Sequence, residues 1–518
     1  MGTIKNVLFI MCDQLRWDHL AHAGHPHIRT PNLDALAARG VRFAQHYVQS
    51  GICGPSRMSA YTGRYVASHG ATHNRVPLSV GEVTLGWHLR ESGRTLALAG
   101  KTHVLPDVQG MRRLLLDGQD ELAVLLREGW FTLLDRHDGH HAETQSAYAH
   151  WLRTQGYDSP DPWTDFVIAV TAPDGTHHSG WKMRNVKWPA RIREEHSETA
   201  YTTDHALRFI EQQGEQPWVL HLSYVKPHWP YVAPAPYHAM YGPEACLPVR
   251  RHAAERGPDI HPALREFQNE EVAESFQRED CIANVRPAYQ GLITQLDGHL
   301  GRVWALLDRM GRWEDTLVLF TSDHGDYLGD HWLGEKELFH DCIQRVPMLA
   351  AAPGGPRGAV VERFTEAVDL VPTILDALGL DAAEHVVEGR SLMPFLRGEA
   401  PAAWRGHAIS ELDWTFRGAR RRLGLPTGQH RAFMIRDADW KYVHWTSGLP
   451  PQLYDLRADP DEFHDRGTDP ALEPVRVRLR EALWEWASNL KCRTTLTWAE
   501  AEFRTDRHKA AGVYFGEW

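Results

Sequence analysis

The sequence predicts an α/β protein with a doubly wound, mostly parallel sheet and a smaller C-terminal α+β subdomain. Continuous apolar runs, typical of strands buried on both faces, recur along the chain and lead into polar residues. Helical patterns separate these runs, as a parallel sheet with crossover helices requires. Beyond about residue 400 shorter strand-like pieces follow, and 518 residues are enough for both parts.

The elements of the α/β part follow from these patterns. We expect strands at 7–11, 41–43, 95–99, 218–223, 316–322 and 346–351. We expect helices at 30–40, 53–63, 84–92, 197–210, 287–312 and 369–379. Residues 106–195 are weakly patterned, and we expect insertions and loops there that shape the mouth of a site.

The chain is expected to divide into an α/β domain at 1–400 and a subdomain at 401–518. The pieces 407–410, 432–435 and 440–443 predict a small antiparallel sheet, and 475–488 predicts a helix. The chain ends in an aromatic tail at Trp518. An exposed apolar end is a liability, so we expect the tail to dock on its own domain or on a partner subunit of a homo-oligomer, a dimer or tetramer.

Composition excludes several classes of protein. The net charge of −11 argues against a nucleic-acid partner, because phosphate contacts need clustered basic residues. Six scattered cysteines form neither a disulfide framework nor a CxxC metal site. The apolar run at 7–11 is too short for a signal peptide, and no run of 18 apolar residues predicts a membrane span. We therefore expect a cytoplasmic protein without a membrane partner.

Polar residues of chemical interest follow four of the predicted strands. They are Asp13, the pair Lys101 and His103, His228 between two prolines, and the pair Asp323 and His324. In open α/β sheets, ligands bind beyond the carboxyl ends of the strands, so these side chains can converge on one site. Taken singly, each has an ordinary explanation, such as a helix-capping aspartate or a solvent-exposed loop histidine.

The stretch at 51–64 carries a cysteine in an unusual setting. Pro55 suits the first turn of a helix and Gly63 suits its end, which places Cys53 at the helix N-terminus. The helix dipole favours negative charge there, and Arg57 adds a fixed cation one turn on. An isolated cysteine is more commonly a small buried hydrophobe.

Cys53-Gly-Pro-Ser-Arg57 followed by Thr62-Gly-Arg64 resembles the signature of the formylglycine-dependent sulfatases, which belong to the alkaline phosphatase superfamily. Further stretches resemble the same family: 30–36, 227–231, 369–379 and 453–462. The resemblance implies that Cys53 is oxidised to formylglycine by a formylglycine-generating enzyme, and that the hydrated aldehyde is the nucleophile. It also implies one divalent metal held by Asp13, Cys53, Asp323 and His324.

The resemblance implies roles for the other site residues. Arg57, Lys101 and Lys336 would neutralise charge on the ester oxygens or the nucleophile. His228, together with Lys336, would protonate the leaving group. His103 would take a proton from the remaining hydroxyl, so that sulfate is expelled and the aldehyde is restored. Asn74 would bind the ester oxygens. The alternative is that Asn74 only stabilises a turn, as asparagine commonly does.

Two residues depart from the common sulfatase pattern. Gln14 stands where a second aspartate is usual, and His324 follows Asp323 where an asparagine is usual. One carboxylate fewer and one imidazole more widen the choice of metal to manganese, calcium, iron or zinc, with manganese or calcium favoured. Both substitutions resemble the bacterial phosphonate monoester hydrolases and related arylsulfatases. Lys101-Thr-His103, in contrast, resembles the sulfatase form of the pocket wall.

These observations predict hydrolysis of small sulfate esters, as in arylsulfatases, with phosphonate monoesters and phosphodiesters as promiscuous substrates. The first alternative is a hydrolase whose main substrates are phosphonate monoesters or phosphodiesters. A second alternative, from another class, is a non-catalytic relative that binds anions or metal with an unmodified Cys53. A phosphomutase of the same superfamily would normally have serine or threonine at position 53.

Overall fold

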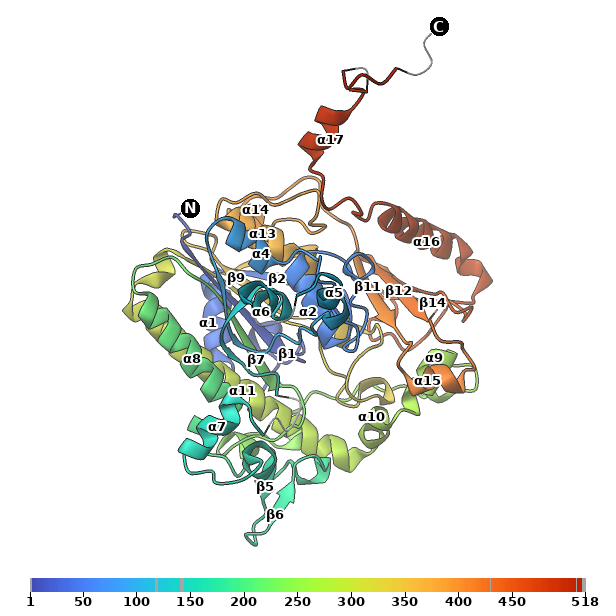
Figure 1. Ribbon diagram of the computed structural model, residues 1–518. Helices are drawn as coiled ribbons and strands as arrows, with labels where there is room; N and C mark the ends of the chain where they lie inside the picture. Colours follow the sequence, from blue (N-terminus) through green and yellow to red (C-terminus); the bar gives the residue numbers. More distant parts are fainter. Residues whose placement is uncertain (1, 117–119, 140–143, 429, 509, 515–518) are drawn as a thin grey trace.

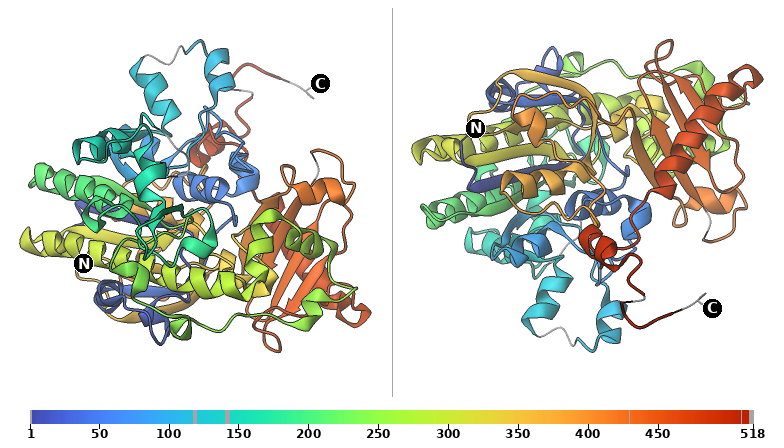
Figure 2. Two further views of the ribbon diagram at one scale, coloured as in Figure 1. Left: turned by 90° about the horizontal axis from the view of Figure 1, so that it is seen from below. Right: turned by 90° about the horizontal axis from the view of Figure 1, so that it is seen from above.

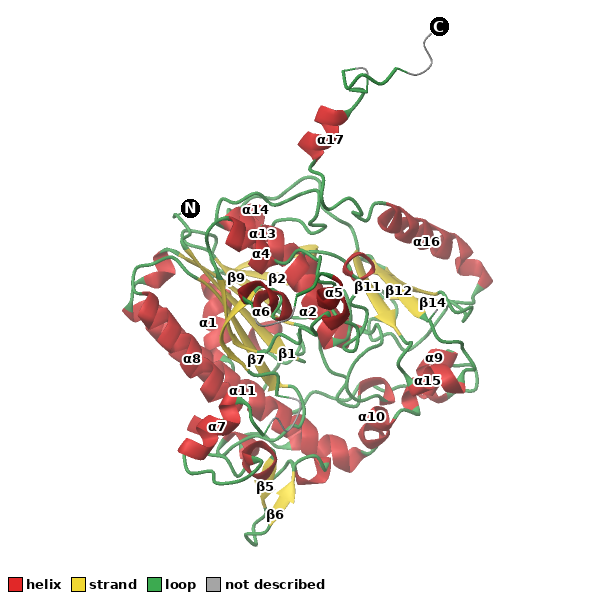
Figure 3. Ribbon diagram, in the orientation of Figure 1, coloured by secondary structure: helices red, strands yellow, loops and turns green. Residues whose placement is uncertain are grey.

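Two sheets organise the computed structural model, which describes residues 2–116, 120–139, 144–428, 430–508 and 510–514 (Figures 1 and 3). The larger sheet has eight strands in the order β10-β2-β9-β8-β1-β7-β3-β4. All its pairings are parallel except those of β9, which runs antiparallel to both of its neighbours. Its strands are β1 (Asn6–Asp13), β2 (Val41–Tyr47), β3 (Leu96–Gly100), β4 (Phe131–Arg136), β7 (Val219–Pro227), β8 (Thr316–Ser322), β9 (Met348–Ala351) and β10 (Ala359–Glu366).

Helices cover both faces of this sheet, which confirms the predicted doubly wound α/β class. One face packs on α1 (Pro31–Arg39), α8 (Glu198–Gln213) and α11 (Glu279–Arg309). The other face packs on α2 (Cys53–Thr62), α4 (Leu85–Glu91) and α13 (Leu370–Ala377). The central strands β1, β7 and β8 are buried along their whole length, as their apolar sequences predict.

The second sheet lies beside the α/β layers and is wholly antiparallel (Figure 2). Its strands are β11 (Ala408–Asp413), β12 (Arg431–Arg436), β13 (Trp440–Trp445) and β14 (Gln452–Asp455), and α16 (Glu473–Ser488) packs against β12 and β13. The sheet and the helix confirm the predicted α+β architecture of this part. The family-like stretch at 453–462 begins within β14.

Two differences from the sequence-based prediction are informative. Residues 106–195 do hold loops, but they also supply β4, the edge strand of the main sheet. Helix α11 begins at Glu279, and Pro287 lies inside it rather than at its start. Burial of the helix against the sheet and α8 outweighs the hydrogen bond that the proline cannot donate.

The C-terminal tail also differs from expectation. Helix α17 (Trp498–Arg504) projects away from the body of the protein instead of docking on it (Figures 1 and 2). Trp498, Phe503, Val513 and Tyr514 are exposed along this segment. The predicted docking of the aromatic end at 514–518 stays a prediction, because its last four residues lie outside the described residues. Among the described helices, none is long and apolar enough to cross a membrane.

Glu411 on β11 makes the stability of the fold depend on pH. It is 1% exposed, pairs with Arg431 and accepts a hydrogen bond from the backbone N–H of Ala67. Burial raises its pKa from 4.5 to about 7. The folded state therefore holds this proton more tightly than the unfolded chain, so stability falls as pH rises from 4.5 through 7, by up to about 3 kcal/mol.

The Glu411→Gln variant should lack this dependence. We expect the unfolding free energy of the wild type, measured by urea titration, to decline relative to that of the variant between pH 5 and pH 8. A difference between the two proteins that is constant over this range would contradict the assignment.

Candidate active site

Four neighbouring strands of the main sheet deliver the predicted site residues to one edge. In the order β8-β1-β7-β3, the carboxyl ends of these parallel strands lie side by side. Asp323 follows β8, Asp13 ends β1, His228 follows β7 and Lys101 follows β3. The strand order thus brings together residues that are far apart along the chain. Asp13 and Asp323, for example, are separated by 310 positions.

Cys53 begins α2 and faces this group of side chains. It is 1% exposed, and Gly63 ends the helix in the left-handed conformation, with φ of 67°. The Cys53 Sγ atom lies 3.0 Å from Lys336 Nζ and 3.1 Å from His324 Nε2. Burial alone would raise the pKa of this thiol, but the two lysines, His324 and a hydrogen bond from His103 hold it well below its ordinary value. The position therefore stabilises an anionic nucleophile.

Asp13, Cys53, Asp323 and His324 form a compact set of potential metal ligands. All four are buried, and one donor atom from each lies within 4.8 Å of the others. His324 Nδ1 contacts the Gly325 carbonyl oxygen at 2.8 Å, which leaves Nε2 facing Cys53. Carboxylate and imidazole donors around one point fit a divalent cation. The cysteine sulfur marks the place where the hydroxyls of a hydrated formylglycine would lie.

Arg57 orients the carboxylates of this set. Its Nε atom donates to Asp323 Oδ2 at 2.7 Å, and its Nη2 atom lies 3.4 Å from Asp13 Oδ2. Its Nη1 atom donates to Ser223 Oγ at 2.8 Å and to the Lys101 carbonyl at 3.1 Å. The guanidinium is fully buried and directed at protein groups. This geometry gives Arg57 a positioning role on the ligands, and its predicted neutralisation of charge on the ester oxygens or the nucleophile stays a prediction.

Lys336 and His228 form the other wall of the site. Lys336 Nζ lies 3.0 Å from both Cys53 Sγ and His228 Nε2. Burial and Lys336 lower the pKa of His228 to about 3. Burial would also lower the pKa of Lys336, but the neighbouring Cys53 thiolate raises it above its ordinary value. The proton between these two residues therefore rests on Lys336, and His228 is neutral.

Asn74 lies directly beside the nucleophile position. Its side-chain oxygen accepts the backbone N–H of Gly54 at 2.7 Å, and a Cβ atom at Gly54 would be only 2.7 Å from that oxygen. Only glycine leaves room for this contact. Asn74 therefore fixes the first turn of α2, and its predicted binding of the ester oxygens stays a prediction.

Sequence reasoning missed Asp138, which shapes the turn after β3. Its Oδ1 atom accepts the backbone N–H groups of Thr102 at 3.0 Å and His103 at 3.2 Å. His103 has a positive φ of 58°, a strained conformation that this carboxylate helps to hold. The position of Asp138 just after the edge strand β4 could have identified it as a candidate site residue. The weak pattern of residues 106–195 concealed that strand.

Sequence reasoning also missed the partners of Gln14. Its side-chain amide donates to Asp326 Oδ2 at 2.6 Å, and Tyr231 donates to the same oxygen at 2.7 Å. Its side-chain oxygen accepts from Lys336 at 3.3 Å. Burial raises the pKa of Asp326 to about 6. Gln14 thus connects Lys336 to the buried carboxyl group of Asp326.

Comparison with known proteins agrees with this geometry. The model of the family described as "Sulfatase" matches residues 5–380, and the model "N-sulphoglucosamine sulphohydrolase, C-terminal" matches residues 329–489. The chain is 35% identical over 496 residues to the multifunctional alkaline phosphatase superfamily protein PehA of Trinickia caryophylli, covering 90% of this chain and 92% of the relative. It is 27% identical to an arylsulfatase of Clostridium perfringens, covering 88% and 89% of the two chains. The solved phosphonate monoester hydrolase of Silicibacter pomeroyi superposes with a TM-score of 0.85 at 33% identity, covering 95% and 97% of the two chains.

Proposed function

Because this chain belongs to the sulfatase family of the alkaline phosphatase superfamily, we propose that it hydrolyses sulfate esters of the arylsulfatase type at the Cys53 centre. Phosphonate monoesters and phosphodiesters are further proposed substrates. The observation that carries the proposal is the buried set of Asp13, Cys53, Asp323 and His324, with Lys336 Nζ 3.0 Å from the nucleophile position.

One site can serve these esters because all of them are tetrahedral and carry a single negative charge at neutral pH. Arg57, Lys101 and Lys336 supply fixed positive charge around the centre, which favours such anions over neutral esters. Lys101 and His103 follow the sulfatase pattern and favour sulfate. The names of the relatives, PehA and phosphonate monoester hydrolase, favour the alternative that phosphonate esters are the main substrates.

Relative rates on matched esters decide between these two activities. We expect kcat/KM for 4-nitrophenyl sulfate to exceed that for 4-nitrophenyl phenylphosphonate, using protein matured with a formylglycine-generating enzyme. The reverse order would make the phosphonate ester activity the main one. Absence of turnover on both esters, with formylglycine present and metal supplied, would refute the proposal.

The proposed chemistry needs a divalent cation and formylglycine, with manganese or calcium as the favoured metal. Asp13, Asp323, His324 and residue 53 would hold the cation, which lowers the pKa of the hydrated aldehyde so that it can act as nucleophile. Arg57 keeps Asp323 and Asp13 in place. Lys336 donates the proton that the leaving oxygen requires, His228 orients that ammonium group, and His103 accepts a proton from the group at position 53.

The role of Lys336 can be tested through the leaving group. In a Lys336→Met variant we expect hydrolysis of phenyl sulfate to slow by about 10²- to 10³-fold, because phenoxide needs a proton as it departs. Hydrolysis of 4-nitrophenyl sulfate should slow by about tenfold or less, because its leaving group is stable as an anion. Steady-state kcat values on the two esters measure this difference, and equal losses on both would argue against proton donation by Lys336.

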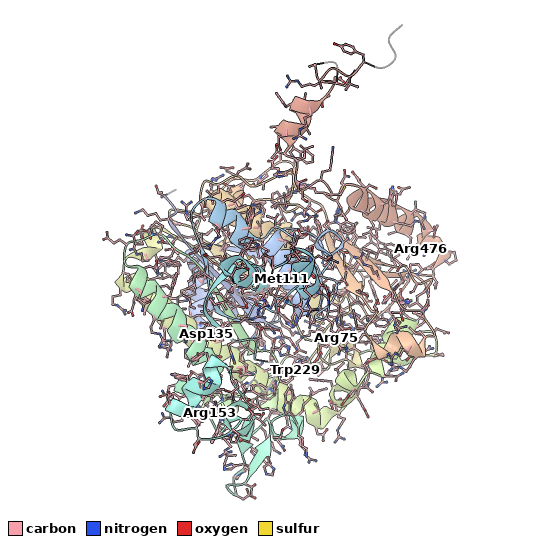
Figure 4. All side chains as sticks on the ribbon, in the orientation of Figure 1. Arg75, Met111, Asp135, Arg153, Trp229 and Arg476 are labelled. Atoms are coloured by element: carbon pink, nitrogen blue, oxygen red, sulfur yellow. The ribbon has the colours of Figure 1, made fainter. Side chains whose placement is uncertain are left out.

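A row of tryptophans leads outward from the centre and favours an aromatic leaving group. Trp229, labelled in Figure 4 above the hairpin of β5 (Ala169–Thr171) and β6 (His177–Ser179), has its ring centroid 4.6 Å from that of His228. The ring centroid of Trp181 lies 5.4 Å from that of Trp229, and Trp181 is 45% exposed. Offset aromatic pairs contribute about 0.5–1.5 kcal/mol each.

We therefore expect a Trp181→Ala variant to raise KM for aryl sulfates by about three- to tenfold, with a smaller change for a short alkyl sulfate. Trp484, which is 75% exposed on α16, provides the control substitution Trp484→Ala, for which KM should stay unchanged. Equal changes in KM on aryl and alkyl esters would contradict stacking on Trp181.

We further propose that the chain forms a homo-oligomer through its projecting tail. The exposed aromatic residues Trp498, Phe503 and Tyr514 support this proposal, because isolated exposed aromatics on a projecting helix gain little in the monomer. Light scattering of the full chain and of a chain ended before Trp498 measures the effect. The shorter chain should form oligomers with fewer subunits than the full chain. An unchanged number of subunits would refute a role for the tail.

A further inference from the structure

Lys226, two residues before His228, is a buried lysine that the chemistry proposed above does not use. It is 6% exposed and is the next to last residue of β7. Its Nζ atom donates to the carbonyl oxygens of His228 at 3.2 Å and Pro230 at 3.1 Å. Two of the three N–H bonds of the ammonium group therefore hold the backbone of the loop that carries His228.

The carbonyl group between these two sets the orientation of the His228 ring. The Trp229 carbonyl oxygen lies 2.7 Å from His228 Nδ1. Because a carbonyl oxygen can only accept, Nδ1 carries the proton of the neutral ring and Nε2 keeps its lone pair. That lone pair faces Lys336 Nζ at 3.0 Å. Lys226 thus holds the carbonyl groups on either side of the contact that directs His228 at Lys336.

Glu198 balances the charge of Lys226 inside the protein. It is the first residue of α8, is 3% exposed, and its Oε2 atom lies 3.5 Å from Lys226 Nζ. Burial raises the pKa of Glu198, but Lys226 and His137 lower it to about 2, so the carboxylate is ionised at neutral pH. An ammonium group buried without an anion would be costly. The buried position of Lys226 therefore depends on Glu198.

Glu198 joins segments that are far apart along the chain. Its Oε1 atom lies 2.7 Å from His137 Nε2, just after β4, and accepts the indole N–H of Trp163 at 3.0 Å, in the loops that precede α8. The Trp163 ring centroid lies 6.1 Å from that of Trp181, the residue proposed above to stack on an aryl group. The carboxylate therefore ties the tryptophan side of the site to the loop held by Lys226.

We propose that Lys226 and Glu198 are positioning residues that act through His228 on the direction of the Lys336 ammonium group. The inference rests on the proposed function, in which Lys336 gives its proton to the leaving oxygen. Lys226 holds the loop, His228 accepts one N–H of Lys336, and the remaining N–H bonds of Lys336 are thereby fixed in direction. The contribution of Lys226 is therefore largest for esters whose leaving group must be protonated.

Steady-state kinetics on phenyl sulfate and 4-nitrophenyl sulfate test the proposal. In a Lys226→Met variant we expect kcat for phenyl sulfate to fall about ten- to a hundredfold and kcat for 4-nitrophenyl sulfate to fall about threefold or less. KM for both esters should stay unchanged, because the variant leaves the ester-binding groups in place. His137 remains beside Glu198 in this variant, so the carboxylate keeps a partner. A variant that only loosened the fold would slow both esters equally.

Glu198→Gln supplies a second variant and serves if the methionine variant does not fold. Glutamine keeps an oxygen that can accept the Trp163 N–H but loses the charge that balances Lys226. We expect it to shift the ratio of the two kcat values in the same direction as Lys226→Met. The double variant should lose little more than Lys226→Met alone, because both residues act through one contact.

A buried lysine elsewhere in the chain provides the matched control. Lys441 is fully buried and pairs with Asp341 and Glu462. The Lys441→Met substitution removes a buried, paired ammonium group of the same kind. The ratio of the two kcat values should stay that of the wild type.

Crystal structures of the wild type and of either variant add a measurement that needs no turnover. We expect the distance between His228 Nε2 and Lys336 Nζ to lengthen from 3.0 Å to beyond about 3.5 Å, the limit of a hydrogen bond. An unchanged distance, or equal losses of kcat on the two esters, would overturn the proposal. A matured, metal-supplied wild type that turns over neither ester would count against the proposed function, and the distance would then decide this inference alone.

Discussion

Replacing Cys53 with alanine should abolish ester hydrolysis, with a fall in kcat of at least about 10⁴-fold. The side chain at this position is the only one at the N-terminus of α2 that faces both Lys336 and His324 among the described residues. Alanine can neither be oxidised to an aldehyde nor provide a metal ligand. Rates on 4-nitrophenyl sulfate at saturating metal measure the loss.

Mass spectrometry of the tryptic peptide containing residue 53 gives this prediction its control. In wild-type protein made with a formylglycine-generating enzyme, we expect the mass of an aldehyde or its hydrate in place of the thiol. Folding of the Cys53→Ala variant can be checked by its thermal unfolding, which should be little changed. An unmodified thiol in active protein would refute the formylglycine mechanism, and an unmodified thiol in inactive protein would favour the non-catalytic alternative.

Replacing Asp13 with asparagine should lower kcat by about 10³-fold and remove one equivalent of bound metal. Asp13 is fully buried, pairs with Lys101 and lies within 4 Å of Cys53 Sγ and His324 Nε2. Asparagine keeps the shape but loses the negative charge that balances both a cation and Lys101. Metal content and kcat should therefore fall together.

Added Mn²⁺ provides the complementary measurement for this variant. Because asparagine still offers one oxygen ligand, a high metal concentration should restore part of the activity, and the apparent metal affinity should be at least tenfold weaker than in the wild type. A variant that retains its metal and its kcat would exclude Asp13 from the metal site. The Asp34→Asn substitution on α1, at a partly exposed aspartate that accepts the backbone N–H of His22 and is not among the potential metal ligands, should leave both quantities unchanged.

The apolar strand pattern was sufficient to predict the α/β core, because fully buried parallel strands must be continuously apolar. The sequences that became β1, β7 and β8 all show this pattern. The edge strands β4 and β10 escaped prediction because polar residues, such as Thr132 in β4 and Glu362 in β10, interrupt the apolar pattern. Edge strands bury less, so their sequences are less constrained.

Motif spacing identified the site residues individually but not what each side chain contacts. The Cys53 stretch predicted a helix N-terminus, which α2 provides. The contact of Arg57 with Asp323 and Asp13 depends on strand order, which no local pattern encodes. The same holds for Asp138 and Asp326, whose roles arise only where separate loops meet.

The sequence by itself determined the fold class, the family resemblance and the chemical types of the site residues, because these depend on local periodicity and on short motifs. The tertiary structure alone decided that burial and Lys336, 108 positions away along the chain, lower the pKa of His228. Distances between such residues are set by packing of the whole chain, and sequence separation carries no information about them.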